Sequence, residues 1–146
     1  MVQIKSSKGG LVDVEIKGVA QARLFLNLKN KDITDGAEAG LFQAANLVQQ
    51  EVQESITGNR KEHKSVDTGR LANSIVVDKA NNETFIVFPE RQTYPGTKTT
   101  TQDVATFMEY GTSKGLQPRR HFRNTSKRTE EESKQIVEKA IKWAIK

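Results

Sequence analysis

The sequence predicts an α+β fold, in which a small antiparallel sheet packs against a long helix and a further helix lies at the C-terminus. Apolar residues alternate with polar ones in residues 11–18, and β-branched and aromatic residues concentrate in the runs 74–79 and 84–88, which indicates strands. Apolar residues recur every three or four positions over residues 34–57, and helical spacing returns over residues 122–145.

The first strand and the residues after it have clear patterns. In "LVDVEIKG", residues 11–18, Val12, Val14 and Ile16 alternate with polar residues and should form the buried face of a strand. Residues 19–29 then place four apolar side chains close to one helical face, namely Val19, Leu24, Phe25 and Leu28. We therefore expect a helical segment between this strand and the long helix.

Residues 34–57 give the clearest helix of the first half. Its apolar face is predicted to hold Ala37, Leu41, Ala44, Val48, Val52 and Ile56. Thr34 or Asp35 is the expected N-cap, and Gly58 is the expected residue at which the chain leaves the helix. Residues 59–70, "NRKEHKSVDTGR", are too polar for a core, so we expect an exposed loop.

A hairpin and a long loop should follow. The runs 74–79 and 84–88 flank Asn81-Asn82, and asparagine tolerates the positive φ of a tight turn. Residues 89–101 are rich in Pro, Gly, Lys and Thr, a composition typical of a loop.

A short helix is predicted over "TQDVATFMEYG". Thr101 is its expected N-cap, and Val104, Phe107 and Met108 are its expected buried side. Gly111 should close it.

The last helix is predicted from a stripe at helical spacing. The stripe consists of Phe122, Thr125, Thr129, Ser133, Ile136, Ala140, Trp143 and Ala144. Glu130–Lys134 and Glu138–Lys142 are supporting ion pairs one turn apart. Half of the stripe is small and polar, whereas a helix packed only on its own core would favour leucine there. The stripe is therefore interpreted as too polar to be wholly core.

Composition sets limits on the class of protein. The chain has 146 residues, and we expect a single domain over residues 1–146. Its hydrophobic content of 35% and mean hydropathy of -0.64 are low for a self-sufficient globule, which favours burial completed against partners. The absence of cysteine excludes a disulfide scaffold, a thiol nucleophile and a thiolate metal site. "MVQIKSSKGG" lacks the apolar core of a secretory signal, and no apolar run suits a membrane span, so we expect a cytoplasmic place of assembly.

Charge is distributed unevenly along the chain. Residues 1–111 hold 13 Lys and Arg against 14 Asp and Glu, whereas residues 112–146 hold 10 against 4. Such a basic C-terminal part is typical of a nucleic-acid contact, a contact with an acidic protein, or a solvated helix. These alternatives stay open at this point.

Catalytic chemistry finds no support in the sequence. The motifs of serine hydrolases, zinc proteases, dinucleotide-binding proteins and nucleotide-binding loops are missing. His63 and His121 alone cannot form a transition-metal site, and the cluster of His63, Ser65 and Asp67 is interpreted as part of a polar loop. We therefore expect no enzyme, no cofactor and no metal.

The basic cluster Arg119, Arg120, Arg123, Lys127, Arg128 has a different interpretation. Arg120, Arg123 and Lys127 share one helical face. We predict that Arg119, Arg120 and Arg123 contact a neighbouring protein, with nonspecific contact to DNA as the lesser alternative.

Two motifs in a fixed order point to a known family. "VDTGRLANSI" is followed, after the predicted hairpin, by "VATFMEYGTSKGLQPRRHF". This order resembles the tailed-bacteriophage family of neck and tail-completion proteins, typified by the gene-ten product of a lambdoid siphophage. The motif positions are Asp67, Thr68, Gly69, Glu109, Gly111, Thr112, Pro118 and Phe122. His121 stands where the family usually has proline, so we expect a looser corner, and the threonine-rich insert before Val104 is a second departure.

The resemblance implies a non-enzymatic virion protein of the phage neck, assembled in the host cytoplasm without contact with a membrane. It would act as a ring oligomer around the DNA channel, completing the tail end or joining tail to head. Its partners would be further copies of itself and other head–tail connector or tail proteins, with DNA close by. The alternatives are a tail terminator that stops tube growth, or a small basic nucleic-acid-binding protein.

The resemblance also gives the second motif a structural meaning. Gly111 allows a tight turn, Pro118 fixes the approach of the chain, and Phe122 anchors the last helix on the core. The arginines would then face outward.

Overall fold

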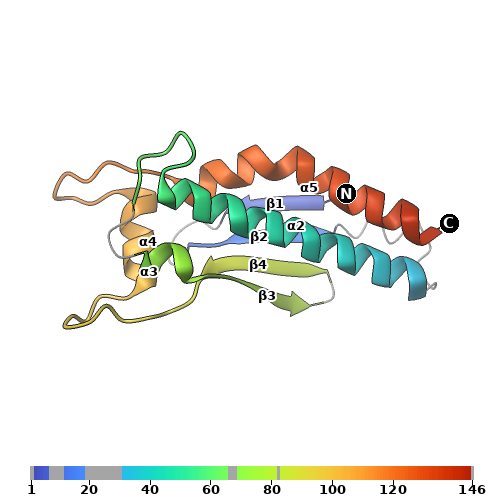
Figure 1. The fold of residues 1–146 in the computed structure, drawn as a ribbon, viewed down its shortest axis with the longest axis horizontal. Helices are drawn as coiled ribbons and strands as arrows, with labels where there is room; N and C mark the ends of the chain where they lie inside the picture. The colour runs from blue at the N-terminus through green and yellow to red at the C-terminus, as the bar shows by residue number, and fades with distance from the viewer. Residues whose placement is uncertain (1, 7–11, 19–30, 66–68, 82, 146) are drawn as a thin grey trace.

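The computed structural model describes residues 2–6, 12–18, 31–65, 69–81 and 83–145 of the chain. The elements follow in the order β1 (Val2–Ser6), β2 (Val14–Gly18), α2 (Lys31–Thr57), α3 (Arg70–Asn73), β3 (Ile75–Asn81), β4 (Thr84–Pro89), α4 (Thr101–Tyr110) and α5 (His121–Ile145). Figure 1 shows an elongated molecule in which α2 and α5 run side by side along the sheet. The predicted α+β fold is confirmed. The helical segment expected over residues 19–29 falls outside the described residues.

The sheet has four strands in the order β1-β2-β4-β3, and every neighbouring pair is antiparallel. Ile16 in β2 lies opposite Phe85 in β4, and Val87 lies between Val14 on one side and Val77 on the other. The predicted alternation of residues 11–18 is confirmed, because Val12, Val14 and Ile16 are all buried. The hairpin of β3 and β4 is confirmed as well, with an irregularity in the pairing between Lys79 and Asn81.

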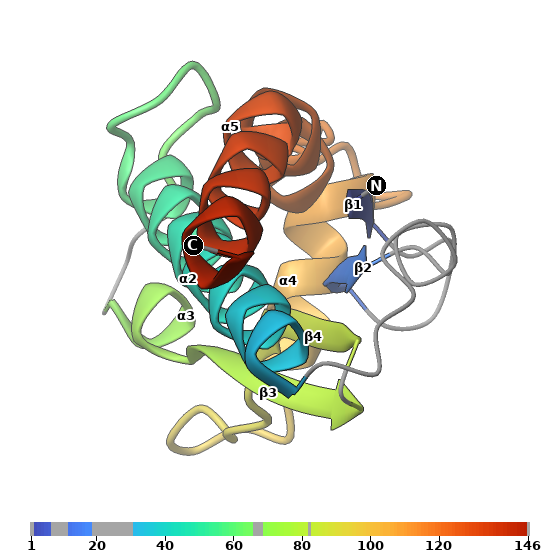
Figure 2. The same cartoon turned by 90° about the vertical axis from the view of Figure 1, so that its right-hand side faces the viewer.

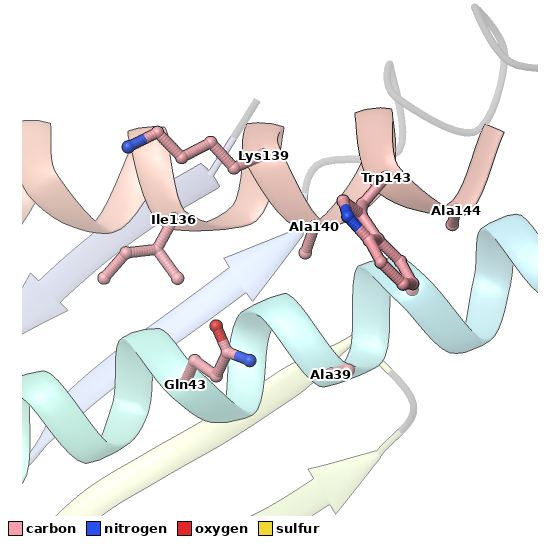
Figure 3. A pocket seen from close by; sticks show the side chains of 8 residues that line it. Ala39, Gln43, Ile136, Lys139, Ala140, Trp143 and Ala144 are labelled. Atoms are coloured by element: carbon pink, nitrogen blue, oxygen red, sulfur yellow. The ribbon is translucent and has the colours of Figure 1, made fainter. Parts of the chain in front are cut away.

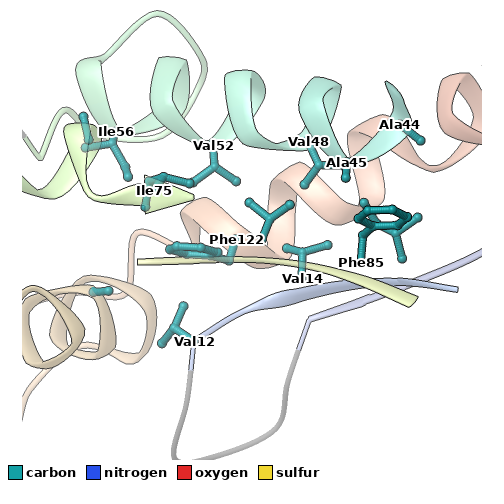
Figure 4. Close-up of a cluster of buried hydrophobic side chains, with 14 of the residues drawn as sticks. Val12, Val14, Ala44, Ala45, Val48, Val52, Ile56, Ile75, Phe85 and Phe122 are labelled. Carbon is teal, nitrogen blue, oxygen red and sulfur yellow. The ribbon is translucent and has the colours of Figure 1, made fainter. Parts of the chain in front are cut away.

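The core lies between α2 and the sheet, and the end-on view of Figure 2 shows α5 stacked against α2. One face of α2 contributes Leu41, Ala44, Ala45, Val48, Val52 and Ile56, all buried. They meet the strand residues Val14, Ile16, Ile75, Phe85 and Val87, together with Phe122 of α5 (Figure 4). Burial of such aliphatic and aromatic side chains is the main force holding α2 on the sheet.

Helices α2 and α5 approach each other too closely for large side chains. A Cβ atom on Gly40 would lie 2.8 Å from Cβ of Ala140, and one on Gly36 would lie 2.5 Å from Cβ of Ala144. The same closeness explains the small polar stripe of α5, where Thr125, Thr129 and Ser133 are fully or almost fully buried. The interpretation of the stripe as not wholly core is confirmed, since Trp143 is 80% exposed. Its small polar residues are nevertheless buried, because close helix packing favours small residues over leucine.

Two helix starts differ from the prediction. Helix α2 begins at Lys31, so Thr34 and Asp35 lie inside it and are not its N-cap. Helix α4 is capped by Thr100 instead of Thr101: the Thr100 hydroxyl accepts the Asp103 N–H at 3.2 Å, and the Asp103 carboxylate accepts the Thr100 N–H at 2.9 Å. This reciprocal arrangement satisfies two backbone donors at once. The predicted end at Gly58 is confirmed by its φ of 92°.

Two aromatic residues lie on the surface, of which Phe107 is predicted to be buried. Phe107 is 44% exposed, because the buried side of α4 consists of Thr101, Ala105 and Glu109. Trp143 is 80% exposed, although its stripe neighbour Ala140 packs against α2. Helical spacing alone places Phe107 on the buried side of α4, and Trp143 on the same stripe as Ala140. The tertiary packing covers other parts of these two helices.

Candidate interaction site at the α4–α5 corner

The end of α4 and the start of α5 are joined by one buried carboxylate. Glu109 is 5% exposed, and its Oε2 accepts the Phe122 N–H at 3.0 Å while its Oε1 accepts the Arg123 N–H at 2.8 Å. The first N–H groups of a helix have no partner within the helix, and a negative charge there also suits the helix dipole. Arg120 lies directly before α5 with a φ of 55°. Its side chain contains no hydrogen-bond acceptor atom and cannot cap the helix, so the carboxylate of Glu109 in α4 does so instead.

The environment of Glu109 acts on its charge in two directions. Burial raises the pKa of the Glu109 carboxyl above its ordinary value, and the hydrogen bonds from Arg123 and Phe122 only partly offset that effect. The positive charges of Arg120 and Arg123 also act to lower this pKa. The cap is therefore a buried carboxyl group that accepts two amide hydrogen bonds, and burial has the larger effect on its pKa.

Gly111 and the following loop fold back on α4. Gly111 has a φ of 77°, and a Cβ atom there would lie 2.5 Å from the Leu116 carbonyl oxygen. Thr112 donates its N–H to that same carbonyl oxygen at 3.0 Å, and the Arg119 N–H reaches the Met108 carbonyl at 2.6 Å. Pro118 closes the turn against Gly111. A residue with a side chain at position 111 would clash in this loop, which is why the motif needs glycine.

His121, which stands where the family usually has proline, lies buried in the corner. The ring is 1% exposed, its Nδ1 lies 2.7 Å from the Ser55 hydroxyl, and its Nε2 lies 2.6 Å from the Ser65 hydroxyl. Burial lowers the pKa of His121 to about 4, so the ring is neutral at physiological pH. This ring connects α5 both to α2 and to the loop of residues 58–65. That the corner is looser than one with proline stays a prediction.

That loop is largely exposed, as predicted, although some of its charged side chains contact the helices. Glu62 is buried and pairs with Arg128 of α5 at 3.0 Å. Arg60 pairs with Glu51 of α2 at 2.6 Å, and this contact lowers the pKa of the Glu51 carboxyl. The loop is therefore exposed, as its polar sequence predicts, and two of its charged side chains pair with residues of α2 and α5.

The first motif occupies the junction of α3 and β3. Gly69 precedes α3 with a φ of 79°, and Asp67 and Thr68 lie outside the described residues. Leu71, Ser74 and Ile75 are buried. The side chain of Gln49 in α2 donates to the Ile75 carbonyl at 2.8 Å, and that of Gln53 donates to the Ala72 carbonyl at 3.2 Å. The motif therefore fixes α3 and the start of β3 on α2.

The predicted interface arginines have unequal surroundings. Arg119 is half-buried and donates to the Ser65 hydroxyl at 2.9 Å and to the Lys64 carbonyl, so it serves the monomer's own loop. Arg120 and Arg123 are exposed. The expectation that the arginines face outward therefore fits two of the three.

Two aromatic residues are exposed on α4, the helix that Glu109 joins to the start of α5. Phe107 is 44% exposed and Tyr110 is 47% exposed, and their spacing of three residues places both on the outer side of α4. We call Phe107, Tyr110, Arg120 and Arg123 the aromatic–arginine surface. The sequence pattern missed its aromatic half because Phe107 was assigned to the core. Arginine and aromatic side chains are enriched in protein–protein interfaces.

Other kinds of site have less support in the described part of the chain. No group of three or more His, Asp or Glu side chains in it is placed to hold a metal ion. None of the described helices combines the length and apolar character needed to cross a membrane.

Comparison with known proteins gives one match. Residues 25–111, more than half of the chain, match the family described as "Bacteriophage HK97-gp10, putative tail-component". The match covers α2 to α4, including Glu109, and ends at Gly111. Neither a curated protein nor a solved structure matches the chain. The chain therefore belongs to the HK97-gp10-like family of bacteriophage tail components, which gives it a structural role in the virion.

Proposed function

We propose that this tail component forms a ring oligomer in the neck of the virion, around the DNA channel, where it completes the tail end and joins the tail to the head. The observation that carries this proposal is the aromatic–arginine surface beside an internally tied corner. Glu109 and His121 use their polar atoms within the monomer, whereas Phe107, Tyr110, Arg120 and Arg123 remain partly or largely in solvent. A rigid corner that presents such residues suits contact with a neighbouring subunit.

A nucleic-acid-binding function is less well supported by the same corner. Nonspecific binding of DNA depends on cations that are available to phosphates. Of the basic cluster, Arg119 donates to residues 64 and 65, and Arg128 pairs with Glu62 and Glu51. Fewer free cations therefore remain than the sequence suggested. A tail terminator stays the main alternative within the same structural class.

Deletion of the gene tests the proposal. A phage that lacks this protein should still package DNA into heads and polymerise tail tubes, but heads and tails should accumulate unjoined. Purified protein added to the lysate should restore infectivity. Electron microscopy distinguishes the alternatives: tails of excessive length would indicate a terminator. Intact virions, or empty unpackaged heads as the sole defect, would contradict the neck assignment.

A further inference from the structure

A closed ring needs two unlike surfaces on each protomer, because each copy contacts the next one head to tail. The inference that follows rests on the ring proposed above. At one end of the long axis lies α4, and at the other end lie the start of α2 and the end of α5 (Figure 1). Each of these two ends carries exposed apolar residues, and the two surfaces differ.

The surface at the α2–α5 end is concave. A groove of about 400 Å³ lies between the two helices, lined by small and apolar residues that include Gly36, Ala39, Ile136, Ala140, Trp143 and Ala144. Figure 3 shows the Trp143 indole projecting from α5 at one end of this groove. Trp143 is 80% exposed. A large apolar side chain that is exposed beside an apolar groove is typical of an interaction surface.

The α4 end carries two exposed aromatic side chains. We call Phe107 and Tyr110 the aromatic projection, because both extend from the outer side of α4 while Ala105 and Glu109 face inward. The groove volume lies within the range of about 300–1,000 Å³ that holds drug-sized ligands. It therefore has room for aromatic side chains such as these two.

Charges at the two ends are complementary. Arg120 and Arg123 are exposed at the start of α5, which Glu109 joins to α4, and Asp35 is exposed on α2 next to Gly36 in the groove. Conversely, Asp103 is exposed one turn before Phe107, and Lys139 lines the groove. Opposite charges around an apolar contact orient two partners and suppress wrong pairings.

We infer that the aromatic projection of one copy inserts into the α2–α5 groove of the next copy and that this contact closes the ring. The partner at both surfaces is a second copy of this chain. Like surfaces do not meet, so the contact is heterologous and leaves no free end once the ring is complete.

Cysteine cross-linking tests the contact directly, because the natural chain contains no cysteine. Phe107→Cys and Ala39→Cys are introduced together into one chain. This double variant replaces the wild-type protein in infected cells. The lysate and the virions are then treated with a short bismaleimide cross-linker. Both positions are solvent-accessible, so the substitutions spare the core. We expect a series of cross-linked oligomers of increasing size, the largest of which contains as many copies as the ring. Either single-cysteine variant should give no cross-linked oligomers. Dimers from Phe107→Cys alone would show that projection meets projection and would overturn the inference.

A mixing experiment supplies a second readout that needs no cross-link. One variant, Phe107→Ala with Tyr110→Ala, keeps an intact groove, and another, Ala39→Arg, keeps an intact projection. Each alone should be monomeric by native mass spectrometry, and an equal mixture should give heterodimers. Retention of rings by both variants would overturn the inference and leave the proposed ring standing. Absence of rings from wild-type lysate and virions would instead overturn the proposed function, and the inference with it.

Discussion

The Glu109 carboxylate of α4 accepts the backbone N–H of Phe122, thirteen positions later in the sequence, at 3.0 Å and thereby caps α5. A second bond, from the Arg123 N–H at 2.8 Å, completes the cap. The glutamate of the "MEYGT" motif is therefore the group that fixes the direction of α5 relative to α4. This makes Glu109 the residue through which the family motif determines the shape of the corner.

Replacing Glu109 by alanine should destabilise the protein. Two buried amides lose their acceptor, and loss of a cap costs about 0.5–2 kcal/mol while an unsatisfied buried donor costs about 1–3 kcal/mol. We expect a total loss near 2 kcal/mol in the free energy of unfolding, measured by urea denaturation. Glu109→Gln should lose less, because its carbonyl still accepts one amide. An alanine variant as stable as the wild type would show that water replaces the carboxylate.

The buried imidazole should make stability depend on pH. The pKa of His121 is about 4 in the folded protein and near 6.5 in the unfolded chain, so the unfolded state binds more protons between these values. Stability contributed by the neutral ring is thus present above about pH 6.5 and is lost as the pH falls toward 4. We expect the loss to be on the order of 3 kcal/mol over this window. Chemical denaturation from pH 7 to 4.5 measures it.

The matched control for that experiment is His121→Gln, which removes the titrating ring. Glu109 acts with the opposite sign, since its raised pKa favours the folded state at low pH and this contribution is lost as the pH rises. The difference between wild type and His121→Gln therefore isolates the histidine. Equal pH dependence of both proteins would contradict the assignment.

The contact of α2 with α5 should be sensitive to one methyl group. Gly40→Ala would place Cβ 2.8 Å from Cβ of Ala140, and overpacking of this kind costs about 1–3 kcal/mol. Alanine also has the higher helix propensity, which offsets about 1 kcal/mol of that cost. The double variant Gly40→Ala with Ala140→Gly should recover part of the loss, as measured by thermal unfolding. If Gly40→Ala alone is as stable as the wild type, α2 and α5 can move apart without loss of free energy of unfolding.

Some elements could be predicted from the sequence, and others could not, for physical reasons. Alternation in β2 and the helical stripe of α2 report burial directly, so both were found, and Gly58 and Gly111 were found because their backbone conformations favour glycine. The roles of Glu109 and His121 depend on partners far along the chain. Local spacing contains no information on such contacts. Phe107 and Trp143 show the same limit. Helical spacing shows which residues share one face of a helix, but not how much of the helix surface other elements bury.

The arginines of the corner should separate assembly from folding. Arg120→Glu with Arg123→Glu should leave the unfolding temperature nearly unchanged, because exposed charges contribute little stability. We expect the same variant to reduce the yield of infectious particles strongly in a complementation assay, since reversed charges repel the neighbouring surface. Lys114→Glu, an exposed change in the nearby loop, is the matched control and should assemble normally. Arg119→Ala should behave differently from both, because it releases the contacts with Lys64 and Ser65 and so loosens the loop of residues 58–65 within the monomer. Normal particle yield from the double reversal would remove Arg120 and Arg123 from the interface, whatever the ring order.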